Sequence, residues 1–289
     1  MSKIFTRRFR VRWSEVGANG QVGPAGYLRY LVETAWDWGI ACGLGVDESK
    51  EFGLAWVIRE TEINFIRPLR HNDIVDFTIW LINWRRVRGT RAFELKLKDS
   101  GEVIAQGVQQ VVSLDEKSMR PVSPPAYIME SFFIEDPRVF PHQRFPKDLP
   151  EYESLNLTER DVEWQDLDEM EHVNNAAYIT YAQEALAQNL AVMGWPPAHL
   201  KDQGLAVDYG RIHIIYLSPA VWGDRLDVRS YTLGRGDTGG QLYIAVARKS
   251  DGEKIFNCIL DWFLVDRISG EKQPVSRLYP KREANDTNK

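Results

Sequence analysis

One loop of the 289-residue chain gathers side chains that could act together on a carbonyl group. Asp168, His172, Asn174 and Asn175 fall within one short stretch, directly before residues at helical spacing. A carboxylate can act as base or nucleophile, and an imidazole can orient water or share a proton near neutral pH. The amide of Asn174 could hold substrate or water. The first N–H groups of a helix lack internal acceptors and lie at the positive end of its dipole, so an oxyanion at the Asn174–Asn175 turn would meet donors.

Each of these residues also has a plain structural interpretation. Asn174 and Asn175 could simply cap the helix, because Asn is a favoured N-cap residue. Asp168 could be a solvated loop carboxylate, and an isolated histidine such as His172 is usually structural. Glu184, further along, is polar among apolar neighbours; it could be a helix carboxylate used in the reaction, or a buried and hydrogen-bonded glutamate.

Two long helices are predicted from the spacing of apolar residues. The later one runs from about Asn175 to about Met193, where apolar side chains recur every three or four positions. The earlier one starts at Gly23-Pro24, where proline suits the first helical position, and continues to about Ile40. Apolar residues extend most of the way round this earlier helix, so we expect it to be buried on most sides.

The chain contains an internal duplication. A shift of 151 residues aligns Val11–Arg120 with Val162–Glu271 without a gap, giving 23 identities in 110 positions. Chance would give about 6–7% from ordinary composition. The chain therefore consists of two similar domains rather than one large one.

Strand-like runs follow each helix, separated by turn signals such as Asp99-Ser100-Gly101, which are typical of antiparallel hairpins. A long helix wrapped by an antiparallel sheet is the hotdog arrangement, so the predicted class is α+β, a double hotdog. A short strand is also expected before each helix, at Phe9–Trp13 and Val162–Trp164. The runs after the helices are Glu62–Ile66, Ile74–Trp80, Arg91–Leu97 and Val103–Leu114, then His213–Leu217, Leu226–Tyr231, Leu242–Ala247 and Ile255–Val265.

Four segments are expected along the chain. Residues 1–120 and 159–279 form the two hotdog domains, and residues 280–289 form a disordered tail. Residues 121–158 form a linker, because seven of the 14 prolines fall between Pro121 and Pro150, and proline disfavours regular elements. Three phenylalanines suggest that this linker lies across the domains: Phe132, Phe133 and Phe140.

Composition excludes several classes of function. With 36 Lys and Arg against 41 Asp and Glu, the net charge of −5 does not favour a nucleic-acid partner. The most basic segment, Arg85 to Arg91, is most simply a solvated face, although a phosphate-bearing carrier or cofactor arm could bind it. Cys42 and Cys258 match no zinc or redox spacing, and no apolar run spans a membrane. We expect a soluble cytoplasmic protein without metal.

The loop resembles a known family signature. The pattern Asp168-x-x-x-His172-Val173-Asn174-Asn175-x-x-Tyr178 is similar to that of the hotdog-fold thioesterases, and with Asp166-Leu167 it most resembles the acyl-ACP thioesterases of plants and bacteria. Glu15–Asn19 resembles the equivalent loop of that family's N-terminal domain. Trp56-Val57 and Gly89-Thr90-Arg91 also match. The resemblance covers about residues 9–120 and 160–278.

This resemblance implies hydrolysis of fatty acyl thioesters on acyl carrier protein or coenzyme A, without a cofactor. It implies that Asp168, His172 and Asn174 are catalytic. It implies that the Asn175 backbone is an oxyanion donor, and that Tyr178 and Glu184 also contact substrate. Two departures concern the machinery: Ile212-His213 stands where the family carries a strand carboxylate, and Met170 where plant enzymes carry Asn.

Only the second half retains the candidate catalytic side chains. Under the 151-residue shift Asp168 meets Gly17, His172 meets Gln21, and Asn174-Asn175 meet Gly23-Pro24. We therefore expect chemistry in the C-terminal half. The N-terminal half would shape the acyl tunnel with three tryptophans, which could equally be plain core: Trp36, Trp38 and Trp56.

Two rival functions are open at this point. A dehydratase of the same fold would act on a hydroxyacyl thioester, but its histidine and acid motif differs. A non-catalytic module would bind acyl thioesters without cleaving them, and the joint presence of Asp168 and His172 disfavours it. A homodimer is possible.

Overall fold

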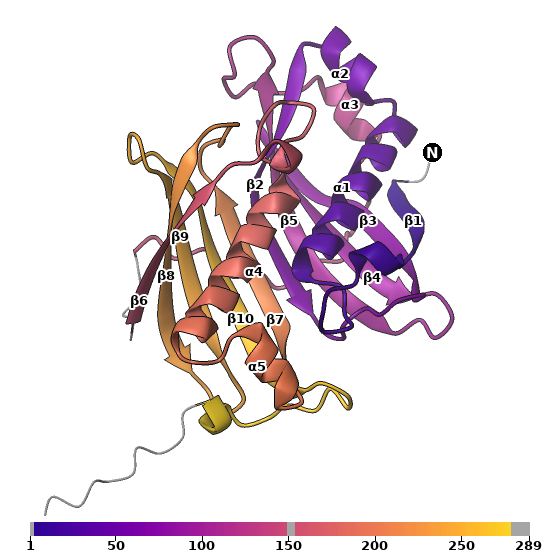
Figure 1. Cartoon of the computed structure of the whole chain (residues 1–289). Coiled ribbons are helices and arrows are strands. Elements are labelled where there is room, and N and C mark those ends of the chain that lie inside the picture. Colours follow the sequence, from indigo (N-terminus) through magenta and orange to yellow (C-terminus); the bar gives the residue numbers. More distant parts are fainter. Residues whose placement is uncertain (1–2, 149–153, 279–289) are drawn as a thin grey trace, which may run out of the picture.

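The computed structural model describes residues 3–148 and 154–278. All strands within these ranges form one antiparallel sheet, and the two long helices α1 (Pro24–Ala41) and α4 (Asn175–Val192) lie against each other on one face of it (Figure 1). The predicted tail, 280–289, lies outside the described residues. The other helices are α2 (Val46–Glu51), α3 (Ala126–Glu130) and α5 (Pro197–Asp202), with 3₁₀ turns η1 (Trp13–Glu15), η2 (Trp164–Asp166) and η3 (Val275–Leu278).

The sheet has the strand order β1-β3-β4-β5-β2-β7-β10-β9-β8-β6, so the two halves of the chain meet at β2 and β7. Glu62 on β2 pairs with His213 on β7, and these positions are 151 residues apart. The duplication therefore folds with a pseudo-twofold axis through this pair. The strands are β1 (Ile4–Arg10), β2 (Leu54–Phe65), β3 (Ile74–Arg85), β4 (Arg88–Leu97), β5 (Val103–Asp115), β6 (Ser154–Asp161), β7 (Leu205–Tyr216), β8 (Arg225–Arg235), β9 (Gly239–Arg248) and β10 (Lys254–Asp266).

The predicted helices are confirmed and the short strands before them are misplaced. The helices α1 and α4 begin at Pro24 and Asn175 as expected. The predicted strands Phe9–Trp13 and Val162–Trp164 are wrong, because β1 and β6 lie earlier and the tryptophans belong to η1 and η2. A side-chain carboxylate closes each of these turns, as where Glu15 accepts the Arg12 N–H at 2.7 Å.

Helix α1 is less buried than its apolar composition predicts. Trp38 is buried, but Trp36 is 45% exposed and Ile40 is 62% exposed. The sheet and α4 cover two sides of α1, so its remaining face meets solvent and the expectation of burial on most sides is wrong. The central strands are also longer than predicted, because β2 begins at Leu54 and β7 at Leu205.

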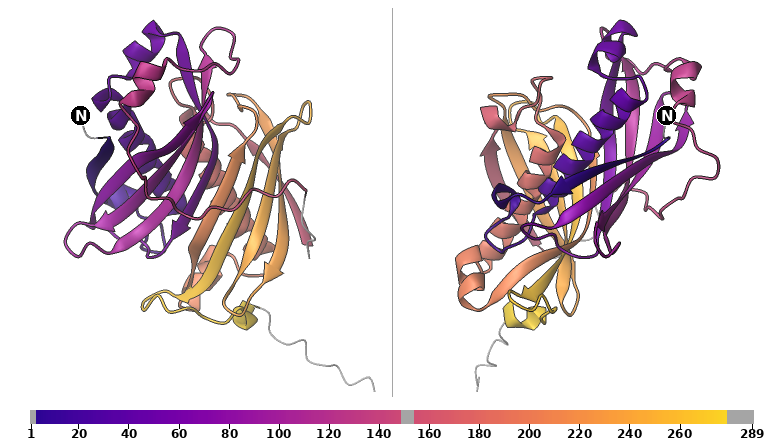
Figure 2. Two further views of the ribbon diagram at one scale, coloured as in Figure 1. Left: turned by 180° about the vertical axis from the view of Figure 1, so that it is seen from behind. Right: turned by 90° about the vertical axis from the view of Figure 1, so that its right-hand side faces the viewer.

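The segment between the halves crosses the sheet face opposite the helices (Figure 2, left). Phe140 packs on the rear of the first half, and Phe145 packs on the rear of the second. Phe132 is buried in the main core, whereas Phe133 is 38% exposed. Helix α3 and the first residues of β6 fall inside the predicted linker 121–158. The predicted domain boundaries stay a prediction.

Candidate active site

A buried acid anchors the loop that precedes α4. Asp166 accepts the Tyr181 hydroxyl at 2.7 Å and the Glu163 N–H at 3.1 Å, and its carbonyl accepts the Asn174 N–H at 2.8 Å. The first half repeats the tyrosine contact, since Tyr30 donates to Glu15 at 2.7 Å. This acid therefore belongs to the contacts that the two halves share.

The backbone of the loop brings Asp168 and His172 together. The Asp168 N–H donates to the His172 carbonyl at 2.9 Å, and the Glu171 N–H donates to the Asp168 carbonyl at 2.9 Å. Glu171 completes this tight turn with φ of 60°. The Asp168 side chain is exposed and accepts the Met170 N–H at 3.0 Å. His172 is half-buried, and its imidazole has no hydrogen bond within the described residues.

The first turn of α4 leaves one peptide donor unused. The Asn174 side chain accepts the Ala176 N–H at 2.9 Å, and the Asn174 carbonyl accepts those of Ala177 at 2.9 Å and Tyr178 at 3.4 Å. The Asn175 N–H has no acceptor in the described part of the chain. Asn174 therefore does cap the helix, and the donor next to it stays available at the positive end of the dipole.

Tyr178 has the contacts of a packing residue. Its buried hydroxyl accepts the Ala220 N–H at 2.9 Å, which ties α4 to the loop after β7. Burial raises its pKa to about 12, and the charge of Asp168 contributes to the increase. Its duplicate Tyr27 accepts the Leu69 N–H at 2.8 Å in the same way. These contacts do not support a substrate-binding role for Tyr178, which stays a prediction.

Glu184 lies apart from the other predicted site residues. It is nine residues beyond Asn175, about 13 Å along the helix axis, and its side chain is exposed. Its carboxylate accepts a hydrogen bond from Gln188 at 3.5 Å. The alternative of a buried glutamate is therefore wrong. Its role as a substrate-binding residue stays a prediction that no contact supports.

The departure at Ile212-His213 has a clear geometric outcome. Ile212 faces the main core, whereas His213 lies on the rear face of the sheet. There Nε2 of His213 lies 2.6 Å from the Glu60 carboxylate, and the ring packs on Phe145. His213 thus joins the halves and cannot reach the α4 turn, so it does not replace the strand carboxylate.

The first half contributes an apolar surface close to this site. On the helix-facing side of β2 and β3, Trp56, Ile58 and Trp84 stay half-buried and border the main core. Tyr216 connects this region to α4, because its hydroxyl donates to the Asn175 carbonyl at 3.4 Å. Of the three expected tunnel tryptophans, Trp56 is the one whose position suits that role.

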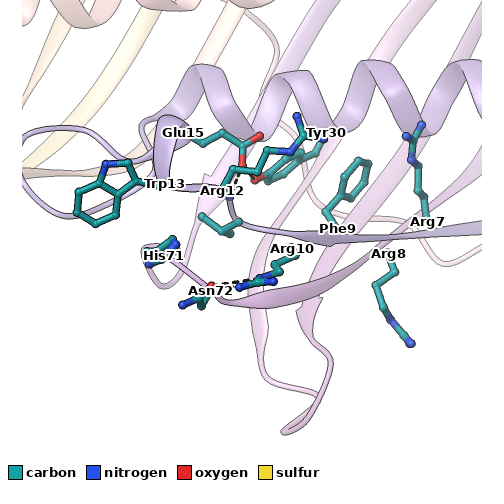
Figure 3. A pocket seen from close by; sticks show the side chains of 11 residues that line it. Arg7, Arg8, Phe9, Arg10, Arg12, Trp13, Glu15, Tyr30, His71 and Asn72 are labelled. Carbon is teal, nitrogen blue, oxygen red and sulfur yellow. Dashed lines mark hydrogen bonds between the residues drawn. The ribbon is translucent and has the colours of Figure 1, made fainter.

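The most basic regions of the chain lie outside this loop. A pocket beside β1 is lined by Arg7, Arg8, Arg10 and Arg12 (Figure 3). Arg7 and Arg8 are already paired with carboxylates, and Arg10 binds Asn72. Arg85, Arg86 and Arg88 are exposed around the β3–β4 turn, as expected of a solvated face, but Arg91 points into the first half.

Two negative findings apply to the described residues alone. No cluster of three or more His, Cys, Asp or Glu side chains is placed to hold a metal ion. No helix among them is both long and apolar enough to cross a membrane. Cys42 and Cys258 are buried and free.

Each half of the chain matches the model of a protein family. Residues 2–132 match the model of the acyl-ACP thioesterase N-terminal domain. Residues 162–277 match the thioesterase-like superfamily. The fold and these matches define a double hotdog protein. The C-terminal half is similar to the thioesterase-like superfamily, and the N-terminal half is similar to the N-terminal domain of acyl-ACP thioesterases.

Individual curated relatives share about a quarter of the aligned residues with this chain. A chloroplastic palmitoyl-acyl carrier protein thioesterase of Cuphea hookeriana is 25% identical over 225 residues, covering 72% of this chain and 51% of the relative. Oleoyl-acyl carrier protein thioesterase 1 of Arabidopsis thaliana is 24% identical, covering 64% and 56%. The chain spans about half the length of the curated relatives it matches.

Solved structures confirm the fold. A putative oleoyl thioesterase of Lactobacillus plantarum aligns with a TM-score of 0.76 at 16% identity, covering 90% of this chain and 96% of that one. The 12:0-ACP thioesterase of Umbellularia californica aligns with a TM-score of 0.68 at 19% identity, covering 91% and 98%. The predicted double hotdog is therefore confirmed.

Proposed function

We propose that this protein hydrolyses fatty acyl thioesters at the N-terminus of α4, with acyl-ACP favoured over acyl-CoA. The observation that carries the proposal is the unused Asn175 N–H beside the Asp168–His172 turn. Thioester hydrolysis needs an oxyanion donor and a means of activating water, and both kinds of group meet at this one loop.

In the proposed reaction the substrate carbonyl oxygen accepts the Asn175 N–H. The Asp168 carboxylate takes a proton from a water molecule as its oxygen attacks the carbonyl carbon, while His172 orients that water. The tetrahedral intermediate then collapses by breaking the C–S bond. The thiolate leaves and takes up the proton, so the products are a free fatty acid and the carrier thiol. Asn174 would hold the substrate through its side-chain NH₂, since its oxygen is occupied by the cap.

The preference for a carrier protein rests on two supports. The N-terminal half matches the acyl-ACP thioesterase type, and the relatives above are named as acyl-ACP thioesterases. The exposed arginines of the β3–β4 turn could bind an acidic carrier. A coenzyme A substrate, a homodimer and a cytoplasmic location stay predictions; the curated relatives named above are chloroplastic.

The direct test measures thiol release from acyl-ACP and acyl-CoA of graded chain length, with wild type beside Asp168→Ala and His172→Ala. We expect hydrolysis by wild type and losses of about 100- to 10,000-fold in kcat for the variants, the range typical of acid–base groups. Both variants should keep the wild-type melting temperature, because neither side chain is buried. Binding without cleavage by wild type, or full activity of both variants, would refute the proposal.

A further inference from the structure

Arg91 is the charged residue whose surroundings the proposed reaction leaves unexplained. It lies on β4, where Phe93 and Leu95 face the main core and Ala92 faces the rear of the sheet. Strand alternation therefore points Arg91 toward α1, into the first half. Its Nε donates to the Gln109 side-chain oxygen at 2.9 Å, and its Nη2 donates to the same atom.

No negative charge balances this guanidinium. No carboxylate among the described residues pairs with Arg91, and its Nη1 has no hydrogen-bond partner there. Burial lowers its pKa to about 10 and is the cause of the whole change. A partly buried cation is normally paired, because even partial removal from water without a counter-charge is costly. The unused donors of Arg91 therefore suit an anionic group supplied from outside the chain.

A row of polar side chains leads from Arg91 toward the candidate active site. Gln109 donates to Thr61 at 2.9 Å, and the hydroxyl of Tyr216 donates to the Asn175 carbonyl at 3.4 Å. These residues lie on four adjacent strands, β4, β5, β2 and β7. At about 4.8 Å per strand spacing, the strand of Arg91 lies about 14 Å from the strand of Tyr216.

The surface around Arg91 is otherwise apolar and partly open. Trp56 and Trp84 lie on the same side of the sheet with ring centroids 5.6 Å apart, and both stay half-buried, as does Arg91 itself. Thr61 and Ile63 on the same strand face as Trp56 are fully buried, so the incomplete burial is local. An apolar wall with one cation beyond it is complementary to a hydrocarbon chain that carries an acidic group.

We propose that Arg91, held by Gln109, forms a subsite for a carboxylate borne on the acyl chain at a distance from the thioester. The inference rests on the proposed function, because it assumes that the thioester lies at the N-terminus of α4. The preferred substrates would then be monothioesters of dicarboxylic fatty acids. The guanidinium fork matches a carboxylate, and charge-assisted hydrogen bonds are among the stronger polar contacts.

The test compares two ligands that differ only at the far end of the chain. Calorimetry measures the binding of dodecanedioate and dodecanoate to the full-length protein, and thiol release is measured for dodecanedioyl-CoA and dodecanoyl-CoA. We expect wild type to favour the dicarboxylic ligand and substrate by about 10- to 100-fold in Kd and in kcat/KM. Arg91→Met should remove that preference, and Arg91→Lys should keep part of it.

Lys96→Met is the matched control, since Lys96 lies on the same strand but is paired with Glu94 at 2.7 Å, so it should leave the preference unchanged. Equal binding of the two acids by wild type, binding of neither, or a preference that survives in Arg91→Met would overturn the subsite. A protein that binds dodecanedioate selectively but releases no thiol from any thioester would instead refute the proposed function. If Arg91→Met does not fold, Arg91→Lys and the wild-type ratio still decide.

Discussion

The N-termini of α1 and α4 are duplicates that differ in what their first turns leave exposed. In α4 the Asn175 N–H has no acceptor among the described residues. In α1 the equivalent residue is Pro24, which has no N–H at all. The next donor of α1, the Ala25 N–H, is taken by the Gln183 side chain at 3.3 Å. Of these two duplicated termini, the one at α4 therefore keeps an unused peptide donor among the described residues.

The side chains around the two helix N-termini also differ, being polar at α1 and apolar at α4. Gln183 and Tyr209 lie next to the start of α1, with the Gln183 amide 3.5 Å from the tyrosine hydroxyl. The positions 151 residues earlier, which the pseudo-twofold places next to α4, are Val32 and Ile58. Polar side chains fill the first terminus, whereas apolar ones border the second. At these equivalent positions the α4 side is therefore apolar and the α1 side polar.

Replacing Asn175 by proline, the residue at the equivalent position of α1, is expected to have the largest effect on activity. Asn175→Pro removes the N–H and should lower kcat about 100- to 1000-fold, the usual loss for one oxyanion donor. The fold should tolerate it, because proline suits the first position and Asn174 already has the extended backbone that precedes proline, with φ of −60° and ψ of 142°. Kinetics with acyl thioesters and a melting curve measure the two effects.

Pro24→Ala is the control for that variant. It restores an N–H at the start of α1, where no catalytic side chain lies nearby, and should leave kcat/KM unchanged. An Asn175→Pro protein that folds and retains full activity would show that the Asn175 donor has no part in catalysis.

Tyr27 and Tyr178 accept the same kind of backbone hydrogen bond in the two halves, so they test whether the halves are stabilised alike. Replacing either by Phe leaves one buried backbone N–H, of Leu69 or of Ala220, without its acceptor. Each change should cost about 1–3 kcal/mol of unfolding free energy, or a few degrees in Tm. Tyr27 also donates to the Arg67 carbonyl at 3.4 Å, so its loss should equal or slightly exceed that of Tyr178. A clearly larger loss for Tyr178 would show that the halves are not stabilised alike.

The same tyrosines make stability depend on alkaline pH. Burial raises the pKa of Tyr178 from its ordinary value near 10 to about 12. Above pH 10 the unfolded chain loses this proton and the folded chain keeps it, so the free energy of unfolding falls as pH rises from about 10 to about 12. Tyr178→Phe should make this decline shallower, as measured by urea unfolding across that range. A decline unchanged in the variant would contradict the assignment.

Local patterns predicted the features that neighbouring residues decide. The starts of both helices were predictable because Pro24 and Asn175 suit helix N-termini, and the double hotdog followed from the gapless duplication. Long-range contacts decide the rest. Gln183 capping Ala25 joins residues 158 positions apart, and Gln109 supporting Arg91 requires the register of two strands. Gln109 shares its strand with Gln106 and Gln110, so the sequence alone did not single it out.

Burial was the property that the sequence predicted least well. Trp36 and Trp38 are both large and apolar, yet one faces solvent and the other the core, because α4 and the sheet cover only part of α1. Glu184 is exposed because it lies on the face of α4 that neither α1 nor the sheet covers. Composition states what a side chain prefers, but the packing of a second helix decides which face of the first is covered.

The smallest expected effect concerns Gln183, whose side chain lies at the N-terminus of α1. Gln183→Val copies the residue found at Val32 and removes the cap on the Ala25 N–H, so it should cost about 0.5–2 kcal/mol of unfolding free energy. It should leave kcat/KM unchanged, because the α1 terminus still lacks an N–H at Pro24 and has Gly17 at the position equivalent to Asp168. Denaturant unfolding and steady-state kinetics separate the two quantities. A tenfold loss of kcat/KM with normal stability would show that the first helix terminus takes part in the reaction, and the division of labour between the two halves would be wrong.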